Sequence, residues 1–194
     1  MSRWSGQAAF IIGVIAMMII RAPHGRRSGT VKIAESRKGR QEVVLLALMW
    51  IATLILPLIS VATPFLSFAD YSPRPVTLVP GIACLAVGLW LFYRSHADLG
   101  DNWSITLELR EEHRLVTRGV YRRIRHPMYA AIFLQAIAQA LLLPNWLAGP
   151  VCLIAFLVMF ALRIGPEERM MLEKFGGDYA DYIGRTRRLI PNVW

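Results

Sequence analysis

The chain has 194 residues, of which 55% are hydrophobic, and its mean hydropathy is +0.43. The apolar residues form long blocks, which indicates a single-domain integral membrane protein and argues against an ordinary soluble globular protein. A net charge of +9 also suits nucleic-acid binding, but here the Lys and Arg residues lie between the apolar blocks. This placement indicates membrane topology and contact with anionic lipid heads, and we expect no nucleic-acid partner.

Three apolar runs come first, over residues 8–20, 43–61 and 76–93, and the first could extend over residues 4–21. Each is near the ~20 residues that a membrane-spanning helix needs. The first run also has the length of a signal-peptide core, but only Arg3 precedes it and no convincing small-residue cleavage site follows. We therefore predict a retained helix. Pro57 should kink the second helix near its far end, because its ring clashes with the preceding turn.

Two further apolar runs, residues 129–143 and 146–162, are separated only by Pro144 and Asn145. So short a connection predicts an antiparallel helical hairpin. The run 129–143 would be about 22 Å long as a helix, against a hydrocarbon core of about 30 Å. The sequence therefore leaves open whether the hairpin spans the membrane or is partly re-entrant.

The distribution of basic residues predicts an orientation. Segments 21–42, 94–128 and 163–194 contain seven, seven and six of the 22 Lys and Arg residues. Five crossings with the N-terminus outside place all three segments, and the C-terminus, on the cytoplasmic side. We predict an all-α integral membrane protein with about five transmembrane helices. It forms one domain over residues 1–194, with three spans in residues 1–93 and the helical hairpin 127–163 within residues 94–194.

A basic and aromatic cluster, Arg125 to Tyr129, directly precedes the hairpin, and the hairpin ends in Glu167 and Glu168. Ionisable groups at the edge of an apolar segment are costly to desolvate, so this arrangement suggests a site. Pro127 suits the first turn of a helix, whose free N–H groups and neighbouring arginines would suit an anion. The same arginines also fit ordinary positive-inside anchors.

Several of these side chains have two interpretations. His113 and His126 are either surface histidines or hold polar groups of a ligand. Tyr121 and Tyr129 are either interfacial aromatics or stack on a flat ligand such as adenine.

The last helix should continue past its apolar run, which places Arg163 and Glu167 four residues apart on one face, able to form an internal pair. Pro166 lies between them and predicts a kink or a break there.

Motifs for other chemistries are missing from the sequence. It contains no GxGxxG, Walker loop, GxSxG or HExxH, so it gives no support to Rossmann dinucleotide chemistry or to ordinary hydrolase triads. Cys84 and Cys152 lie inside apolar runs without a CxxC or a Cys/His spacing suited to zinc, so we expect inert thiols and no metal site.

Residues 94–194 contain an ordered set of motifs: residues 113–121 (HRLVTRGVY), residues 125–129 (RHPMY), Glu167-Glu168 and residues 175–182 (FGGDYADY). With these motifs the segment resembles the isoprenylcysteine carboxyl methyltransferase family, part of a wider group that includes phospholipid methyltransferases. The family pattern often has Gly two residues after the tyrosine of the second motif, where this chain has Ala131. Another small residue there still permits close helix packing.

The resemblance implies an integral membrane methyltransferase that uses S-adenosylmethionine, gives S-adenosylhomocysteine, and has its cofactor pocket in the C-terminal half on the cytoplasmic side. It also implies that Arg163 and Glu167 are the catalytic residues near the reacting end and contact the substrate. The cofactor-binding residues carried over by motif position are Glu108, His113, Arg114, Leu115, Val116, Tyr121, His126, Pro127, Met128 and Tyr129.

The implied reaction forms a methyl ester on the α-carboxylate of a C-terminal S-isoprenylcysteine. A carboxylate is already ionised at neutral pH, so it needs desolvation and placement and no general base. We expect Arg163 to steer this carboxylate and Glu167 to orient Arg163 or contact the cofactor. The alternatives are an N-methyltransferase of phosphatidylethanolamine-type lipids, in which Glu167 or a tyrosine accepts a proton, and a non-enzymatic membrane protein that binds lipid.

Overall fold

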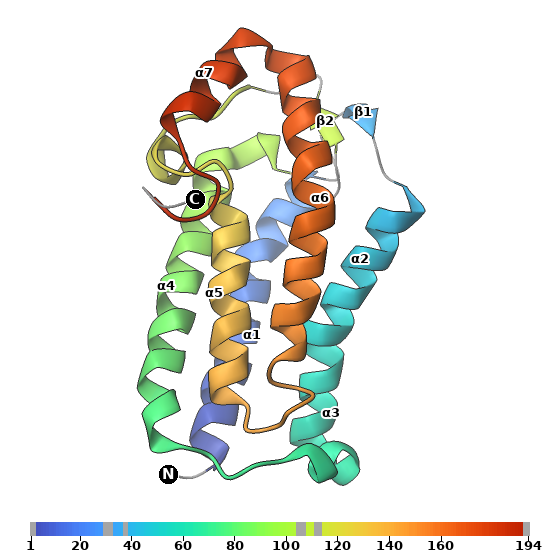
Figure 1. Ribbon diagram of the computed structural model, residues 1–194, viewed down its shortest axis with the longest axis vertical. Coiled ribbons are helices and arrows are strands. Elements are labelled where there is room, and N and C mark those ends of the chain that lie inside the picture. Colours follow the sequence, from blue (N-terminus) through green and yellow to red (C-terminus); the bar gives the residue numbers. More distant parts are fainter. Residues whose placement is uncertain (1–2, 29–32, 37–38, 104–107, 111–113, 192–194) are drawn as a thin grey trace.

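The computed structural model describes residues 3–28, 33–36, 39–103, 108–110 and 114–191. Long helices run roughly side by side and make an elongated bundle (Figure 1). In chain order the helices and strands are α1 (Arg3–Ser28), β1 (Ile33–Ser36), α2 (Arg40–Trp50), α3 (Leu56–Ala62), α4 (Pro75–Leu99), β2 (Glu108–Arg110), α5 (Pro127–Leu142), α6 (Val151–Phe175) and α7 (Gly177–Arg185).

Three helical segments are long and apolar enough to cross a membrane: Trp4–Arg26, Arg40–Ala62 and Pro75–Leu99. Each contains one of the three predicted N-terminal runs, which are thereby confirmed as helices of membrane-crossing length. The predicted end of the third run at residue 93 was too early. An ion pair between Arg94 and Asp98, at 3.1 Å, supports one more turn, and Gly100, with φ of +55°, then ends α4.

The second span is irregular just before Pro57, where the sequence predicted a kink. A π-helical turn, Ile51–Ile55, separates α2 from α3. Proline displaces the carbonyl four residues earlier, and an inserted π turn is one way for a helix to accommodate this. Gln139 of α5 donates hydrogen bonds from Nε2 to the carbonyl of Ala52 in this turn, at 2.8 Å, and to that of Ala148, at 2.7 Å.

Helices α5 and α6 lie side by side and run in opposite directions (Figure 1). The connection between them occupies residues 143–150, so the predicted two-residue turn and a helix starting at residue 146 are wrong. The buried side chain of Asn145 organises this longer turn, because its Oδ1 accepts from the N–H groups of Leu147 and Ala148. The amide of Asn145 also donates to the Leu66 carbonyl and to Asp70, which ties the turn to the segment before α4.

Helix α6 continues without interruption through Pro166 to Phe175, so the helix is not broken there. Ionic contacts hold it on both sides of the proline: Arg163 pairs with Glu42 of α2, and Glu168 pairs with Arg125 before α5. These lateral contacts fix the direction of the helix where the proline removes a backbone hydrogen bond.

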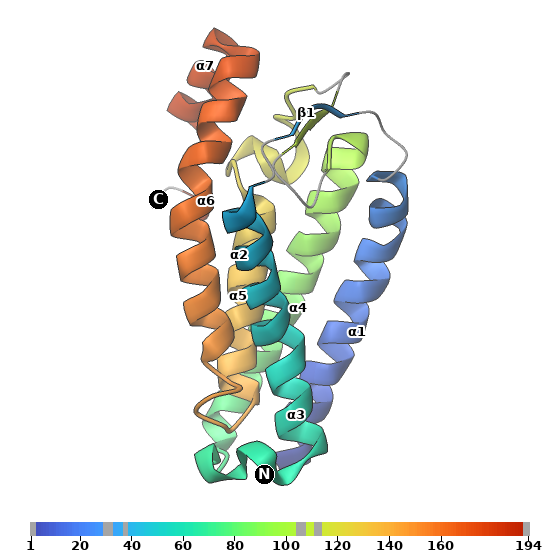
Figure 2. The ribbon, with the colours of Figure 1, turned by 90° about the vertical axis from the view of Figure 1, so that its right-hand side faces the viewer.

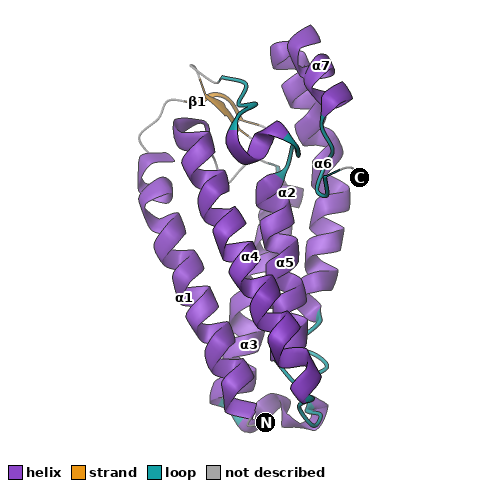
Figure 3. Ribbon diagram, turned by 90° about the vertical axis from the view of Figure 1, so that its left-hand side faces the viewer, coloured by secondary structure: helices purple, strands orange, loops and turns teal. Residues whose placement is uncertain are grey.

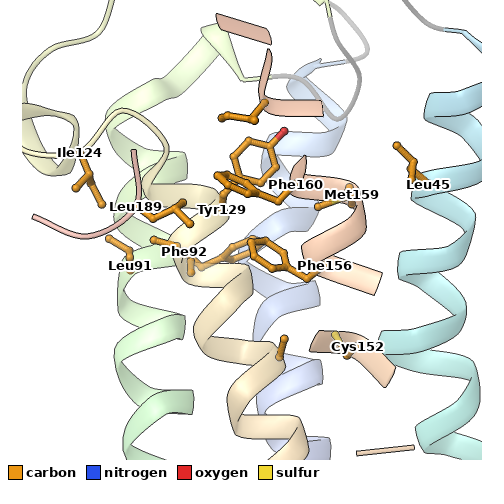
Figure 4. Close-up of a cluster of buried hydrophobic side chains, with 14 of the residues drawn as sticks. Leu45, Leu91, Phe92, Ile124, Tyr129, Cys152, Phe156, Met159, Phe160 and Leu189 are labelled. Carbon is orange, nitrogen blue, oxygen red and sulfur yellow. The ribbon is translucent and has the colours of Figure 1, made fainter. Parts of the chain in front are cut away.

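The main apolar core lies between α4, α5 and α6 (Figure 4). Phe156 and Phe160 of α6 stack with ring centroids 5.8 Å apart, and Tyr129 of α5 meets Phe160 edge to face at 5.5 Å. Small residues bring α4 and α5 close together: a Cβ on Gly88 would lie 3.3 Å from the Ala131 carbonyl oxygen.

The end of the bundle opposite the first turn of α1 carries α7 and an antiparallel strand pair (Figures 2 and 3). β1 pairs with β2, with Glu35 opposite Leu109. β1 lies within the basic segment 21–42, and β2 lies within the basic segment 94–128. The all-α prediction therefore holds for the bundle and misses this small pair of strands.

Candidate functional site

The two halves of the predicted site meet at the end of the bundle that carries α7. The Tyr129 hydroxyl donates to Glu167 Oε2 at 2.7 Å, and His126 Nδ1 lies 3.6 Å from Glu167 Oε1. The other ring nitrogen of His126 lies 3.4 Å from Glu168 Oε1. The start of α5 thus faces both carboxylates of α6, because antiparallel packing returns the chain to the level at which α5 begins.

Glu168 is the hub of a buried ionic cluster. Arg125 Nε donates to its Oε1 at 3.0 Å, and Arg188 Nη2 donates to its Oε2 at 2.8 Å. Burial alone would raise the pKa of Glu168, but hydrogen bonds from His126, Arg188 and Arg125 lower that pKa below its usual value. Glu168 is therefore a carboxylate at neutral pH. Arg125 is committed to this cluster and is not a free anion-binding residue of the α5 N-terminus.

His126 has a raised pKa. Burial disfavours the imidazolium, but hydrogen bonds to Glu167 and Glu168 outweigh burial and raise the pKa of His126 above its ordinary value. The same contacts act on Glu167: burial raises its pKa, while His126, the charge of Arg163 and the Tyr129 hydroxyl lower it by more. Glu167 is thus ionised and already accepts hydrogen bonds, so it is poorly suited to accept a proton.

Backbone hydrogen bonds from the segment after α7 hold this cluster in place. Arg125 N donates to the Arg187 carbonyl at 2.7 Å, and His126 N donates to the Arg188 carbonyl at 3.0 Å. The buried hydroxyl of Tyr182 donates to the carbonyl of Tyr121 at 2.6 Å. The aromatic tail motif thus positions the segment before α5.

Arg163 has a partner that the sequence did not suggest. Its Nη2 lies 3.2 Å from Glu42 Oε1; the Glu42 side chain is buried, and that of Arg163 is 10% exposed. An internal pair with Glu167 was predicted, but the Glu167 carboxylate accepts a hydrogen bond from Tyr129 and has His126 as its ionic partner. An acidic residue at the start of the second apolar run was the signal that was overlooked, since a carboxylate there needs a cation.

A cavity of about 300 Å³ lies beside this cluster. Its polar end is lined by Tyr121, Arg125, His126, Tyr129, Arg163 and Glu167, and its apolar end by Met17, Leu46, Met49, Ile132 and Met159. Met18 of α1 and Trp50 of α2 also line it, yet they are 42% and 52% exposed, so the cavity opens sideways between these two helices.

The family model described as the isoprenylcysteine carboxyl methyltransferase (ICMT) family matches residues 81–173, which include the hairpin and both carboxylates. This part of the chain is similar to that family, in agreement with the resemblance that the motifs carry.

Named relatives agree with the family match. A protein-S-isoprenylcysteine O-methyltransferase B of Arabidopsis thaliana is 36% identical over 119 residues, covering 58% of this chain and 58% of the relative. A protein-S-isoprenylcysteine O-methyltransferase of Saccharomyces cerevisiae is 33% identical over 134 residues, covering 67% of this chain and 56% of the relative. The matched regions therefore span little more than half the length of these two relatives.

A solved structure supports the fold. The structure of a eukaryotic intramembrane Ras methyltransferase, ICMT, superposes with a TM-score of 0.56 at 25% identity, covering 92% of this chain and 60% of the other. Together with the three membrane-length helices, this similarity makes the chain an integral membrane protein.

Most of the residues carried over from the ICMT family line the cavity. They are Arg114, Leu115, Val116, Tyr121, His126, Met128, Tyr129, Arg163 and Glu167. Pro127 is buried at the first turn of α5 and does not line it. Glu108 lies in β2, and His113 lies outside the described residues.

Polar residues in the cavity wall, or paired with it, were missed from the sequence. Glu42 pairs with Arg163, and Arg21 of α1 lies among the lining residues. Gln135 of α5 also lines the cavity and is 2% exposed, and within the described part of the chain neither its Nε2 nor its Oε1 has a hydrogen-bond partner. A buried amide without partners is costly, so this side chain is suited to meet a polar group inside the cavity.

Proposed function

We propose that the protein transfers a methyl group from S-adenosylmethionine to the α-carboxylate of a C-terminal S-isoprenylcysteine and so forms a methyl ester. One observation carries this proposal: a single cavity joins an ionic and aromatic end to an apolar end that opens sideways between α1 and α2. An acceptor with a charged head and a hydrocarbon tail needs such a combination, with the tail among the apolar helices and the head at their edge.

The residues present fit S-adenosylmethionine. Leu115 and Val116 line the cavity, and their backbone groups take part in none of the hydrogen bonds between described residues, which leaves them available to an adenine edge. Tyr121 and Trp103 add aromatic surface, and Glu167 adds a carboxylate that favours a cationic ligand. The residues that would hold the cofactor are Arg114 to Val116, Tyr121, and His126 with Met128 and Tyr129; for Glu108 and His113 the proposal rests on the motif alone. When bound, S-adenosylmethionine supplies an electrophilic methyl group on a positively charged sulfur.

The protein contributes placement and desolvation. Glu42 holds the Arg163 guanidinium at the boundary between the ionic and apolar parts of the cavity, where it can orient a carboxylate. The acceptor carboxylate is ionised without help, so no general base is required, in keeping with the ionised and hydrogen-bonded state of Glu167. Glu167 instead fixes Tyr129 and His126, which line the cofactor end.

We also propose a membrane arrangement. The described parts of the three basic segments lie at the end of the bundle with α7, while the turn at residues 143–150 and the start of α1 lie at the other (Figure 1). With α5 and α6 as the fourth and fifth crossings, the N-terminus is extracytoplasmic, and the C-terminus and the cofactor end of the cavity are cytoplasmic.

A labelled-methyl transfer assay tests the function. The detergent-solubilised chain is given S-adenosylmethionine with a tritiated methyl group and either N-acetyl-S-farnesylcysteine or phosphatidylethanolamine. We expect labelled ester only from the farnesylcysteine. Label in the phospholipid would favour the N-methyltransferase, and failure to bind S-adenosylhomocysteine at all would favour a non-enzymatic lipid-binding protein.

The role of Arg163 is tested with a matched pair of variants. Arg163→Ala should lower turnover by at least tenfold while leaving S-adenosylhomocysteine affinity nearly unchanged. Arg169→Ala, at an exposed position on the same helix, is the control. Equal turnover in the two variants would exclude Arg163 from the reaction.

A further inference from the structure

Arg21 occupies a distinctive place on the cavity wall. It lies on α1, one turn beyond the exposed Met18 and toward the end of the helix that meets the ionic part of the cavity, and both residues line the cavity. Its guanidinium carbon lies over the ring of the buried Trp103, 5.4 Å from the ring centroid. This cation–π contact fixes the side chain at the sideways opening without supplying an anion.

The other charged groups at the cavity are already compensated or open to water. Arg125 pairs with Glu168, Arg163 pairs with Glu42, and Glu167 accepts a hydrogen bond from Tyr129 and lies beside His126. Arg114, the remaining cation of the lining, is an exposed residue.

Arg21 differs from all of these. It is only partly exposed, and it forms no hydrogen bond or ion pair with any residue that the structure describes. Arg163, a second cation, lines the same cavity. A partly desolvated cation beside a second cation needs an anion, and none of the described residues supplies one to it.

We propose that Arg21 binds a carboxylate inside the cavity and is a ligand-anchoring residue for the methyl transfer. This inference rests on the proposed function, which offers two carboxylates: the α-carboxylate of the acceptor and the carboxylate of the methionyl part of the cofactor. Both present the planar pair of oxygens that a guanidinium binds in bidentate fashion. Arg21 lies outside residues 81–173, so the family match did not include it.

The test uses two pairs of probes that differ in a carboxylate. N-acetyl-S-farnesylcysteine is compared with its neutral methyl ester, and S-adenosylhomocysteine with 5′-methylthioadenosine, which lacks the amino-acid carboxylate. Dissociation constants are measured by calorimetry on the full chain in detergent. The variants are Arg21→Met, which keeps much of the apolar stem, and Arg21→Lys, which keeps the charge; Arg26→Met is the control, since Arg26 is exposed on the same helix and does not line the cavity.

We expect Arg21→Met to raise the dissociation constant of one carboxylate-bearing probe by at least tenfold. A hydrogen bond to a charged group is worth about 1.5–3 kcal/mol, and a tenfold change in affinity corresponds to about 1.4 kcal/mol. The neutral counterpart of that probe should bind as in the wild type. The affected pair identifies the source, the acceptor or the cofactor. Arg21→Lys should recover part of the loss, and Arg26→Met should show none.

Two results would overturn the inference while leaving the proposed function intact. One is unchanged binding of both carboxylate probes to Arg21→Met, and the other is an equal loss for charged and neutral probes, which would show a structural role. If Arg21→Met does not fold, Arg21→Lys is compared with Arg21→Gln by the same criteria. If the wild type binds none of the four probes, the proposed function fails, and this inference fails with it.

Discussion

Replacing Glu168 with Gln should destabilise the end of the bundle that carries α7 and the polar end of the cavity. The carboxylate accepts two short hydrogen bonds, from Arg125 at 3.0 Å and Arg188 at 2.8 Å, and a longer one from His126 at 3.4 Å. A hydrogen bond to a charged group is worth about 1.5–3 kcal/mol and a neutral one about 0.5–1.5, so losing the charge costs about 1 kcal/mol for each short bond. The amide nitrogen of the new side chain would also face a guanidinium donor, which brings the expected loss to about 2–3 kcal/mol.

This loss corresponds to a melting temperature lower by about 4–12 °C for a chain of this size. Differential scanning fluorimetry in detergent measures it, with Asp181→Asn, an exposed carboxylate on α7, as the matched control. Because the Glu168 carboxylate holds Arg188 in place, trypsin should also cleave after Arg187 and Arg188 faster in Glu168→Gln than in the wild type. Melting temperatures of the two variants within about 1 °C of each other would refute the reasoning that the cluster holds the segment after α7.

Three further changes test other parts of the structure. The pKa of His126 is raised in the folded protein, so its contribution to stability is complete below about pH 6.5 and is lost as pH rises through the raised pKa. The melting temperature should therefore fall more steeply with rising pH in the wild type than in His126→Asn. Parallel curves of melting temperature against pH would contradict this. Gly119→Ala should lower the free energy of unfolding by about 1–3 kcal/mol, because φ at Gly119 is +59° and the new Cβ would collide with the Asp98 carboxylate. An unchanged free energy in thermal or chemical unfolding would show that this loop is not held as described. Gln139→Leu should lower the free energy of unfolding by about 2 kcal/mol, because it leaves the carbonyls of Ala52 and Ala148 without their donor. An unchanged melting temperature would rule out a structural role for those two hydrogen bonds.

The meeting of the hairpin ends was predictable from the sequence. Two apolar helical runs joined by a short connection must return the chain to its starting level, which brings Glu167 to His126 and Tyr129. Periodicity and length carry that inference without knowledge of the rest of the fold. The three N-terminal spans were predictable for the same reason, although their ends depended on local features such as the Arg94 and Asp98 pair.

Contacts between helices distant in sequence were not predictable in this way. Glu42 and Arg163 are 121 positions apart, and only the packing of α2 against α6 shows that they pair. Arg21 counted as one more basic residue at a membrane edge until the cavity was located. The eight-residue connection 143–150 depends on hydrogen bonds from the Asn145 side chain to Leu66 and Asp70. No local sequence pattern predicts contacts between residues so far apart in the chain.

The dependence of His126 on late parts of the chain has a consequence for biogenesis. His126 is fixed by the carboxylate of Glu168 and by the Arg188 carbonyl, while Tyr182 fixes the segment just before it. During synthesis these partners leave the ribosome 42 to 62 residues after His126 does. The membrane helices can therefore insert and pair before the wall of the site exists, and the nascent protein cannot acquire a finished site until residue 188 has emerged.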